Sequence, residues 1–99
     1  SDFYLPCTNR EILLRYQNNM KYRLIDQGDY QDALEVVKRM ELIAPKDFWL
    51  ALDKAVLYAR IERPKAAIDE LMIYLDQVVD PIDRAEAEAF LFELQKQIN

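Results

Sequence analysis

Histidine is absent from this chain of 99 residues, and cysteine, glycine and tryptophan each occur once. Without histidine the chain lacks the most frequent general base, the most frequent zinc ligand and any nucleophile of the Ser-His or Cys-His type. The single cysteine, Cys7, excludes an internal disulfide and suits a reducing compartment, which predicts a cytoplasmic protein. We therefore expect no catalytic residue, no cofactor and no metal in this chain.

Tight turns, long apolar runs and excess positive charge are also missing. One glycine and four prolines are too few for the many turns of an all-β fold. No apolar run reaches the ~20 residues that a transmembrane helix needs. With 13 basic and 18 acidic side chains, the formal charge is −5, so the chain has no electrostatic attraction to nucleic acids or anionic lipids. These absences favour an all-α domain whose partners are proteins.

The first expected helix begins at a capping signal. Thr8 can cap its N-terminus, and Glu11 lies three residues later, where it completes a capping box. Apolar residues then recur at helical intervals, which predicts one buried face. They are Leu13, Tyr16, Met20 and Leu24. Gly28, the only glycine, stands where a left-handed residue ends a helix.

Aspartate and proline mark the later helices. Asp29, Asp47 and Asp80 are predicted to cap the second, third and fifth helices. Pro64 and Pro81 suit the first turns of the fourth and fifth helices, where a missing N–H costs no hydrogen bond. Because the connections are short, sequential helices should be antiparallel neighbours. The predicted fold class is all-α, with five helices in antiparallel pairs.

The fifth expected helix carries two apolar sets and a run of acidic residues. The first apolar set has small residues at its centre and comprises Ile82, Ala85, Ala89 and Phe92. The second set comprises Leu91, Leu94 and Ile98. The acidic residues are Asp80, Asp83, Glu86 and Glu88. Paired carboxylates can act in acid–base chemistry, but in the first turns of a helix they complement its dipole, and we favour this second interpretation.

An internal repeat is present at an interval of about 34 residues, the tetratricopeptide period. Shifted by this repeat interval, small or apolar residues coincide in the pairs Ala33/Ala67, Leu34/Ile68, Val37/Leu71, Ala51/Ala85, Ala55/Ala89 and Tyr58/Phe92. The small side chains should let neighbouring helices lie close together while the large ones fill the spaces. Residues 28–34, followed by Pro45, resemble the turn and second helix of a tetratricopeptide repeat. Lys21 departs from that pattern, which has a small residue at this position.

The resemblance implies a tetratricopeptide-like, right-handed stack in a single domain of residues 1–99. The expected parts are a linker or docking segment at 1–7, a first repeat at 8–45, a second repeat at 47–79 and a capping helix at 80–99. In this interpretation the last helix covers the open end of the stack.

Four segments resemble a narrower group, the C-terminal region of bacterial SirB-type proteins. In that group a transglutaminase-like domain is followed by tetratricopeptide-like repeats. The segments are residues 10–21, 28–30, 57–60 and 66–71. The resemblance implies a transglutaminase-like domain before Ser1 in a longer parent chain. The Cys-His-Asp constellation of such a domain is not in this sequence, so its activity is not transferred to this chain.

A candidate contact surface follows from the same resemblance, because the first helix of each tetratricopeptide repeat lines a concave groove. The residues expected there are Arg15, Asn18, Tyr22, Asp26, Trp49, Asp53, Val56 and Arg60. Two adjacent asparagines within a helix cost about 1 kcal/mol relative to alanine, so contacts made by Asn18 and Asn19 should compensate for them. The alternative is that the asparagines bind loops or neighbouring helices and that Trp49 belongs to the core.

Three functional hypotheses remain open. The leading one is a protein–protein interaction module that binds its own N-terminal domain or an unknown protein, with an aromatic anchor such as Trp49 or Tyr22. A second is a structural domain that homodimerises through its first or last helix, because a short repeat stack leaves apolar ends. A third is a domain that gates a transglutaminase-like enzyme within the same chain.

Overall fold

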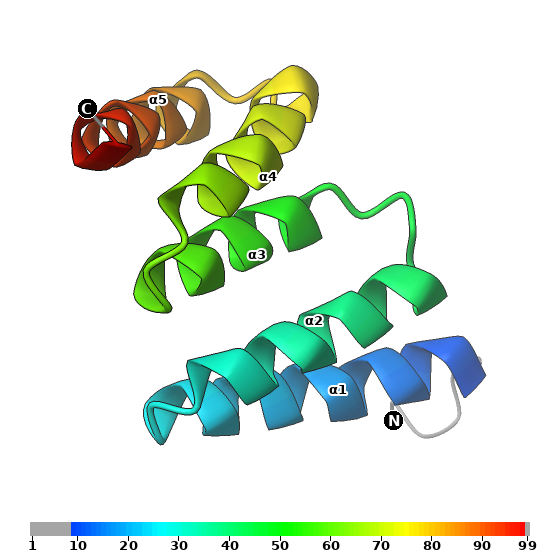
Figure 1. Ribbon diagram of the computed structural model, residues 1–99. Helices are drawn as coiled ribbons and strands as arrows, with labels where there is room; N and C mark the ends of the chain where they lie inside the picture. Colours follow the sequence, from blue (N-terminus) through cyan, green and yellow to red (C-terminus); the bar gives the residue numbers. More distant parts are fainter. Residues whose placement is uncertain (1–8, 99) are drawn as a thin grey trace.

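The computed structural model describes residues 9–98, which form five α-helices joined by short turns (Figure 1). They are α1 (Asn9–Asp26), α2 (Tyr30–Ile43), α3 (Trp49–Arg60), α4 (Pro64–Gln77) and α5 (Pro81–Ile98). Within this range there is no strand. The all-α fold class predicted from the sequence, a stack of five helices, is confirmed.

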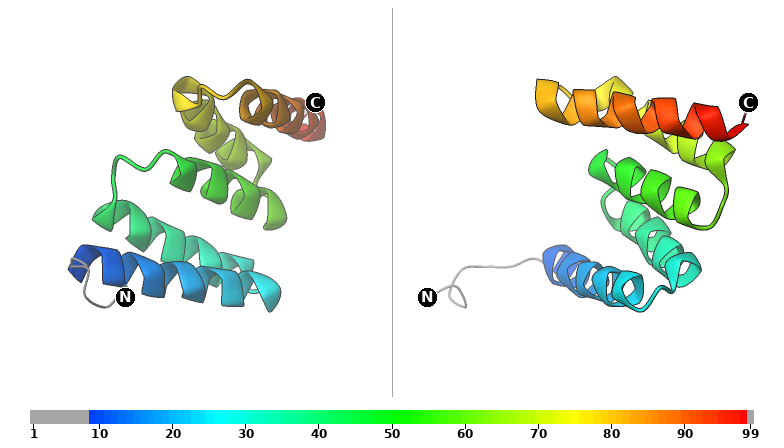
Figure 2. Two further views of the ribbon diagram at one scale, coloured as in Figure 1. Left: turned by 180° about the vertical axis from the view of Figure 1, so that it is seen from behind. Right: turned by 90° about the vertical axis from the view of Figure 1, so that its left-hand side faces the viewer.

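The helices follow one another through the stack in chain order. The main contacts join α1 to α2, α2 to α3, α3 to α4 and α4 to α5. The views in Figure 2 show α1 and α5 at opposite ends of the molecule, which measures 53 × 30 × 21 Å. Each helix therefore packs mainly on its neighbours in the sequence, and the two terminal helices each have one side without such a neighbour.

Of the three predicted aspartate caps, Asp80 and Asp47 each accept a backbone hydrogen bond at the start of a helix, although the residue directly before α3 is Phe48 and not Asp47. The Asp80 carboxylate accepts a hydrogen bond of 3.0 Å from the backbone N–H of Asp83. The Asp47 carboxylate accepts one of 3.1 Å from the backbone N–H of Trp49. The side chain of Asp29 makes no cap hydrogen bond to α2, so that prediction is wrong. The capping box at Thr8 lies outside the described residues, as does Cys7.

The two turns within helix pairs use the same backbone conformation at equivalent positions. Gly28 has a φ of 78° in the turn between α1 and α2. Glu62 lies one repeat interval later, between α3 and α4, and has a φ of 60°. The predicted left-handed end of the first helix is confirmed at Gly28. Pro64 and Pro81 begin α4 and α5, as the first-turn interpretation predicts.

The core consists of two clusters that meet at α3. The first lies among α1, α2 and α3, and its buried members are Ala33, Leu34, Val36, Val37, Met40, Leu50 and Leu57. The second lies among α3, α4 and α5, and its buried members are Ala51, Ala55, Ala67, Leu71, Tyr74, Leu75, Val78, Ala87 and Leu94. Because α3 contributes to both clusters from opposite sides, it is the central element of the fold.

The small residues predicted to let helices approach are buried in the first four helices. Ala33, Ala55 and Ala67 are each 0% exposed, and Ala51 is 4% exposed. These residues belong to the two core clusters, at the surfaces where α2, α3 and α4 pack. The packing role assigned to these alanines is confirmed.

The buried side of α1 differs in part from the predicted one. Leu13 and Tyr16 are exposed, whereas Lys21 is buried and Leu14 is half-buried. The predicted face is half right. Met20 and Leu24 are half-buried against the first cluster, whereas Leu13 and Tyr16 are exposed because α1 packs chiefly on α2 and among the described residues no helix covers its other side. An apolar stripe therefore remains open at the α1 end of the stack.

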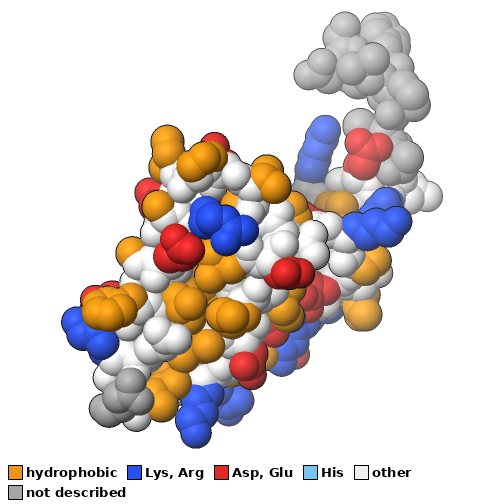
Figure 3. All heavy atoms as spheres, turned by 90° about the horizontal axis from the view of Figure 1, so that it is seen from above, with side chains coloured by type: hydrophobic (Ala, Val, Ile, Leu, Met, Phe, Trp, Pro, Cys, Tyr) orange, Lys and Arg blue, Asp and Glu red, His pale blue; other side chains and the backbone are white. Residues whose placement is uncertain are grey.

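The first apolar set of α5 also faces outward. Ile82 is 71% exposed and Phe92 is 61% exposed, and Ala85 and Ala89 between them are not buried in the core clusters. α5 packs on α4 through the opposite side, where Ala87 and Leu94 are buried. Figure 3 looks onto this end of the molecule, where hydrophobic side chains gather across the surface. The close packing predicted for Ala85 and Ala89 from the repeat is therefore not found, because α5 has no helix on its outer side among the described residues.

Candidate functional site

The eight predicted groove residues lie on two helices and all remain accessible to solvent. α1 carries Arg15, Asn18, Tyr22 and Asp26, and α3 carries Trp49, Asp53, Val56 and Arg60. Asn18 and Asp53 are half-buried and the other six are exposed. Trp49 and Arg60 stand near opposite ends of α3, which makes them roughly 16 Å apart along the helix axis. The eight residues thus form a long strip along two helices and not one compact site.

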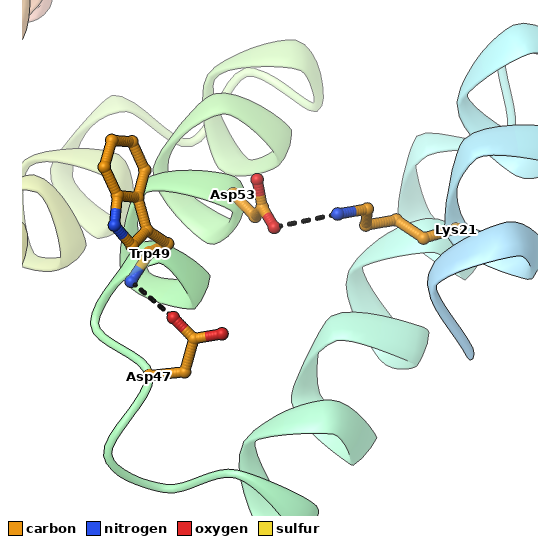
Figure 4. Close-up of polar contacts among 4 residues, drawn as sticks. All are labelled: Lys21, Asp47, Trp49 and Asp53. Carbon is orange, nitrogen blue, oxygen red and sulfur yellow. Dashed lines mark hydrogen bonds and ion pairs between the residues drawn. The ribbon is translucent and has the colours of Figure 1, made fainter. Parts of the chain in front are cut away.

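An ion pair joins the two helices of this strip. The Lys21 ammonium lies 3.0 Å from the Asp53 carboxylate, and the two side chains point toward each other from α1 and α3 (Figure 4). The same ammonium lies 4.4 Å from the ring centroid of Tyr22. Lys21 is 4% exposed, and its hydrogen bond to Asp53 compensates for part of the desolvation of its charge. This contact brings Tyr22 and Asp53 into one neighbourhood.

Arg60 takes part in packing. Its guanidinium carbon lies 5.5 Å from the ring centroid of Tyr30 on α2, within the range of a cation–π interaction. A substitution of Arg60 would therefore change the contact between α2 and α3 as well as the surface, so Arg60 is a poor probe of binding.

Trp49 lies at the edge of the core. It is 45% exposed, and its ring centroid is 5.9 Å from that of Phe48 and 5.2 Å from that of Tyr74. The contact with Tyr74 is edge-on, at an interplanar angle of 64°. The interpretation of Trp49 as a core residue is therefore only half right, because a large part of the indole is open to solvent.

A cavity opens beside Trp49, between α3 and α5. Its volume is about 220 Å³, and its lining residues are Trp49, Leu52, Tyr74, Asp83, Glu86, Ala87 and Phe90. The sequence predicted Trp49 at the contact surface but none of the α5 residues. The α5 residues were not predicted because the sequence indicates a capping helix at 80–99, and a capping helix would not line the groove.

The repeat interval contains the signal that would have found them. Advancing one interval from Trp49, Leu52 and Val56 gives Asp83, Glu86 and Phe90. These residues of α3 therefore have counterparts on α5, and the cavity lies between two helices that correspond at the repeat interval.

The α5 side of the cavity is negatively charged. Within residues 9–98, the carboxylates of Asp83 and Glu86 have no ion pair and no hydrogen bond. Burial raises the pKa of the Tyr74 hydroxyl, and the negative charges of Asp83, Asp80 and Glu86 raise this pKa further. The cation nearest in sequence, Arg84, is engaged elsewhere, because its guanidinium donates hydrogen bonds to two backbone carbonyls at the end of α4.

A second charged cluster connects three helices. The Lys54 ammonium on α3 lies 2.8 Å from the carboxylate of Glu41 on α2 and 3.0 Å from that of Glu70 on α4. Burial alone would lower the pKa of Lys54, but its hydrogen bonds to both carboxylates and their negative charges together outweigh this effect and raise the pKa. Because the ammonium joins carboxylates from two other helices, we interpret this cluster as structural.

Two further kinds of feature are absent from residues 9–98. This part of the chain contains no group of three or more Cys, Asp or Glu side chains arranged to hold a metal ion. It also contains no helix that is both long enough and apolar enough to span a membrane.

Comparison with known proteins agrees with the repeat. A family model described as tetratricopeptide repeat matches residues 20–91, which is most of the chain. The chain belongs to the tetratricopeptide repeat family. No curated protein and no solved structure gives a significant match. Tetratricopeptide repeats generally mediate protein–protein interactions and are typically not catalytic.

In a tetratricopeptide stack, α1, α3 and α5 occupy corresponding positions that are one period of the repeat apart. The match contains no information on a transglutaminase-like domain, so that part of the resemblance stays a prediction.

Proposed function

We propose that this tetratricopeptide domain is a non-catalytic protein–protein interaction module that binds a segment of a partner along α1, α3 and α5. The observation that carries the proposal is the half-exposed Trp49 beside an open cavity. Other apolar side chains of the strip on α1 and α3 are exposed as well. Large aromatic side chains at the centre of an interface supply most of its binding energy. Trp49 fits this role, because its ring is held by Phe48 and Tyr74 and loses little freedom on binding.

The rest of the strip supplies shape and polarity around this anchor. Tyr22 and Val56 are exposed apolar side chains on α1 and α3, and they occupy equivalent positions in successive repeats. The Lys21–Asp53 pair between these helices fixes their relative position. A partner segment would contact a surface that is largely formed before binding, which lowers the ordering cost of association.

We further propose that the domain follows a transglutaminase-like domain, and that it either binds that domain or gates its active site. The resemblance of residues 10–21 to SirB-type proteins supports this context. The exposed apolar side chains of Ile12, Leu13 and Tyr16 on α1 support it as well, since they offer a surface at the end of the stack where a preceding domain would enter. In this context the repeat division at 8–45, 47–79 and 80–99 would describe the C-terminal part of the parent chain.

The groove is tested by selecting peptides from a displayed library on the wild-type domain and measuring their affinity for variants. V56E and R15E place a negative charge on the strip, and each should weaken the selected peptides by about tenfold or more, because a buried unpaired charge or a lost cation costs about 1.4 kcal/mol or more. Both side chains are exposed, so the melting temperature should stay within about 2 °C of wild type.

Two matched substitutions control for the added charge. M72E changes an exposed apolar residue of α4, and K65E changes an exposed cation of the same helix. Both variants should bind the selected peptides as the wild type does. If V56E and R15E bind as tightly as M72E and K65E, the partner does not occupy the strip and the proposal is wrong.

A second candidate function is self-association through α5. α5 repeats α3 at the tetratricopeptide interval, and Ala51 and Ala55 of α3 are buried in the cluster shared with α4. Their counterparts Ala85 and Ala89 on α5 lie outside the core clusters. A face that takes another helix elsewhere in the fold is therefore open here, and a second copy of the chain would supply that helix.

A further inference from the structure

The geometry points to a side-chain pocket for arginine or lysine at the junction of α3 and α5, formed by Trp49 together with Asp83 and Glu86. This inference rests on the proposed interaction function and gives the partner a stated chemistry. The partner segment carries a cationic residue whose aliphatic stem enters the cavity and whose charged head lies at its acidic rim.

The cavity has the size and lining for one long side chain. Its volume of about 220 Å³ is below the ~300 Å³ at which pockets for small-molecule ligands begin. The walls are apolar, with Leu52, Ala87 and Phe90 beside the indole of Trp49. Lysine and arginine have apolar stems that favour such walls while the charged group stays near water.

The charge of the cavity selects a cation. Asp83 and Glu86 both line it, and within the described part of the chain neither carboxylate has a partner. The field of these carboxylates also acts on the hydroxyl of Tyr74, which lines the same cavity. An anionic side chain would be repelled there, whereas an ammonium or guanidinium would form charge-assisted hydrogen bonds with the carboxylates.

Trp49 adds a second reason for a cation. Tryptophan is the aromatic side chain that attracts cations most strongly through its ring face. Because the indole is 45% exposed, part of its surface is available to a bound guanidinium or ammonium. Trp49, Asp83 and Glu86 therefore favour the same class of side chain by independent interactions.

The single tryptophan of the chain allows a direct test, because its fluorescence reports on the cavity that it lines. Tripeptides Ac-Gly-X-Gly-NH2, with X as arginine, lysine, norleucine or glutamate, are titrated into the whole domain. The arginine and lysine peptides should change the emission saturably, with a Kd on the order of millimolar. The norleucine peptide should bind at least about fivefold more weakly, and the glutamate peptide should not saturate.

Paired variants separate the pocket from the overall charge. D83N/E86Q should reduce binding of the arginine peptide to the norleucine level. E88Q/E93Q removes the same number of charges from exposed positions of α5 and should leave binding unchanged. Circular dichroism melting identifies any variant that fails to fold. Asp83→Asn alone provides a second test, because the cap of α5 is made by the carboxylate of Asp80 and does not depend on the Asp83 side chain.

Three outcomes would overturn the inference. They are equal binding of the arginine and norleucine peptides, no saturable response to either, and an equal loss of binding in E88Q/E93Q. None of them bears on V56E and R15E in the peptide selection. A groove that binds peptides without a preference for cations would leave the proposed function standing and remove only the cation pocket.

Discussion

Two lysines have largely buried side chains. At both positions, burying a smaller or uncharged side chain would cost less desolvation free energy. Lys21 occupies the position in α1 that Ala55 occupies in α3, one repeat interval later. Its ammonium reaches Asp53 on α3, so a contact between non-adjacent helices replaces close packing at that position. A hydrogen-bonded pair of this kind contributes mainly by fixing geometry, because the desolvation of both charges offsets much of their attraction.

Lys54 is the better test of a desolvated charge, because its ammonium contacts the carboxylates of Glu41 and Glu70. K54M should lower the free energy of unfolding at pH 7 by roughly 1–3 kcal/mol, since it leaves two partly buried carboxylates without a counter-charge. K38M provides the control: Lys38 pairs with Glu35 at the surface, and its loss should cost less than about 0.5 kcal/mol. Equal losses in urea unfolding would contradict the structural role of the cluster.

The same lysine predicts a dependence of stability on pH. The pKa of Lys54 is raised above its ordinary value of 10.5 in the folded state. The folded chain therefore holds this proton more tightly than the unfolded chain. Its contribution is fully present below pH 10.5 and is lost as the pH rises through the higher folded value. The difference in unfolding free energy between wild type and K54M should shrink above pH 10.5, as measured by urea unfolding along a pH series.

At the scale of elements, the turns show how one backbone geometry is made with two different residues. Gly28 adopts its positive φ without strain, and a Cβ added there would meet no atom within 4 Å. Glu62 adopts the equivalent conformation with a side chain, which costs of order 1 kcal/mol. The packing of α3 on α4 maintains this turn in spite of the local cost.

Glu62→Gly should therefore stabilise the domain by about 0.5–1 kcal/mol, because glycine adopts positive φ without a Cβ penalty. Glu62→Ala removes the same side chain but retains the strain, and it should change stability by less than about 0.5 kcal/mol. Gly28→Ala should destabilise the domain by about 1 kcal/mol through the backbone alone. Thermal unfolding of the three variants measures these effects. An E62G domain no more stable than E62A would contradict the prediction.

At the scale of the whole molecule, both ends of the stack expose an apolar face. The residues of the α5 face are arranged so that this face can pack against the same face of a second copy. The large–small–small–large series of this face, Ile82, Ala85, Ala89 and Phe92, is symmetric about its centre, because the outer spacings are equal. In an antiparallel pair of α5 helices, the alanines of both copies would meet at the centre. Ile82 of each copy would then pack near Phe92 of the other.

Sedimentation equilibrium should accordingly show dimers with a Kd of roughly 10–100 µM. Ala89→Glu should abolish them without lowering the melting temperature, because Ala89 is exposed. Gln95→Glu adds the same charge to another side of α5 and should leave the dimer intact. A chain that stays monomeric well above this range of concentration would rule out this mode of association.

The repeat made much of the fold predictable from the sequence. Local physical reasons predicted the positions of the repeated alanines, the first-turn prolines and Gly28. The structure confirms these predictions for the alanines of the first four helices, for Pro64 and Pro81, and for Gly28. The predicted strip on α1 and α3 follows from the resemblance to tetratricopeptide repeats, and its role in binding stays a prediction.

Which apolar faces are buried was decided by tertiary structure. A helical pattern identifies an apolar stripe but not whether a neighbour exists to cover it. Ile82 and Phe92 are therefore exposed although they belong to an apolar stripe, because no described helix follows α5 in the stack. The cavity beside Trp49 likewise needs α3 and α5 to stand face to face. Local order in this chain is determined by side chains near in sequence, whereas burial and cavities depend on which helices are adjacent in space.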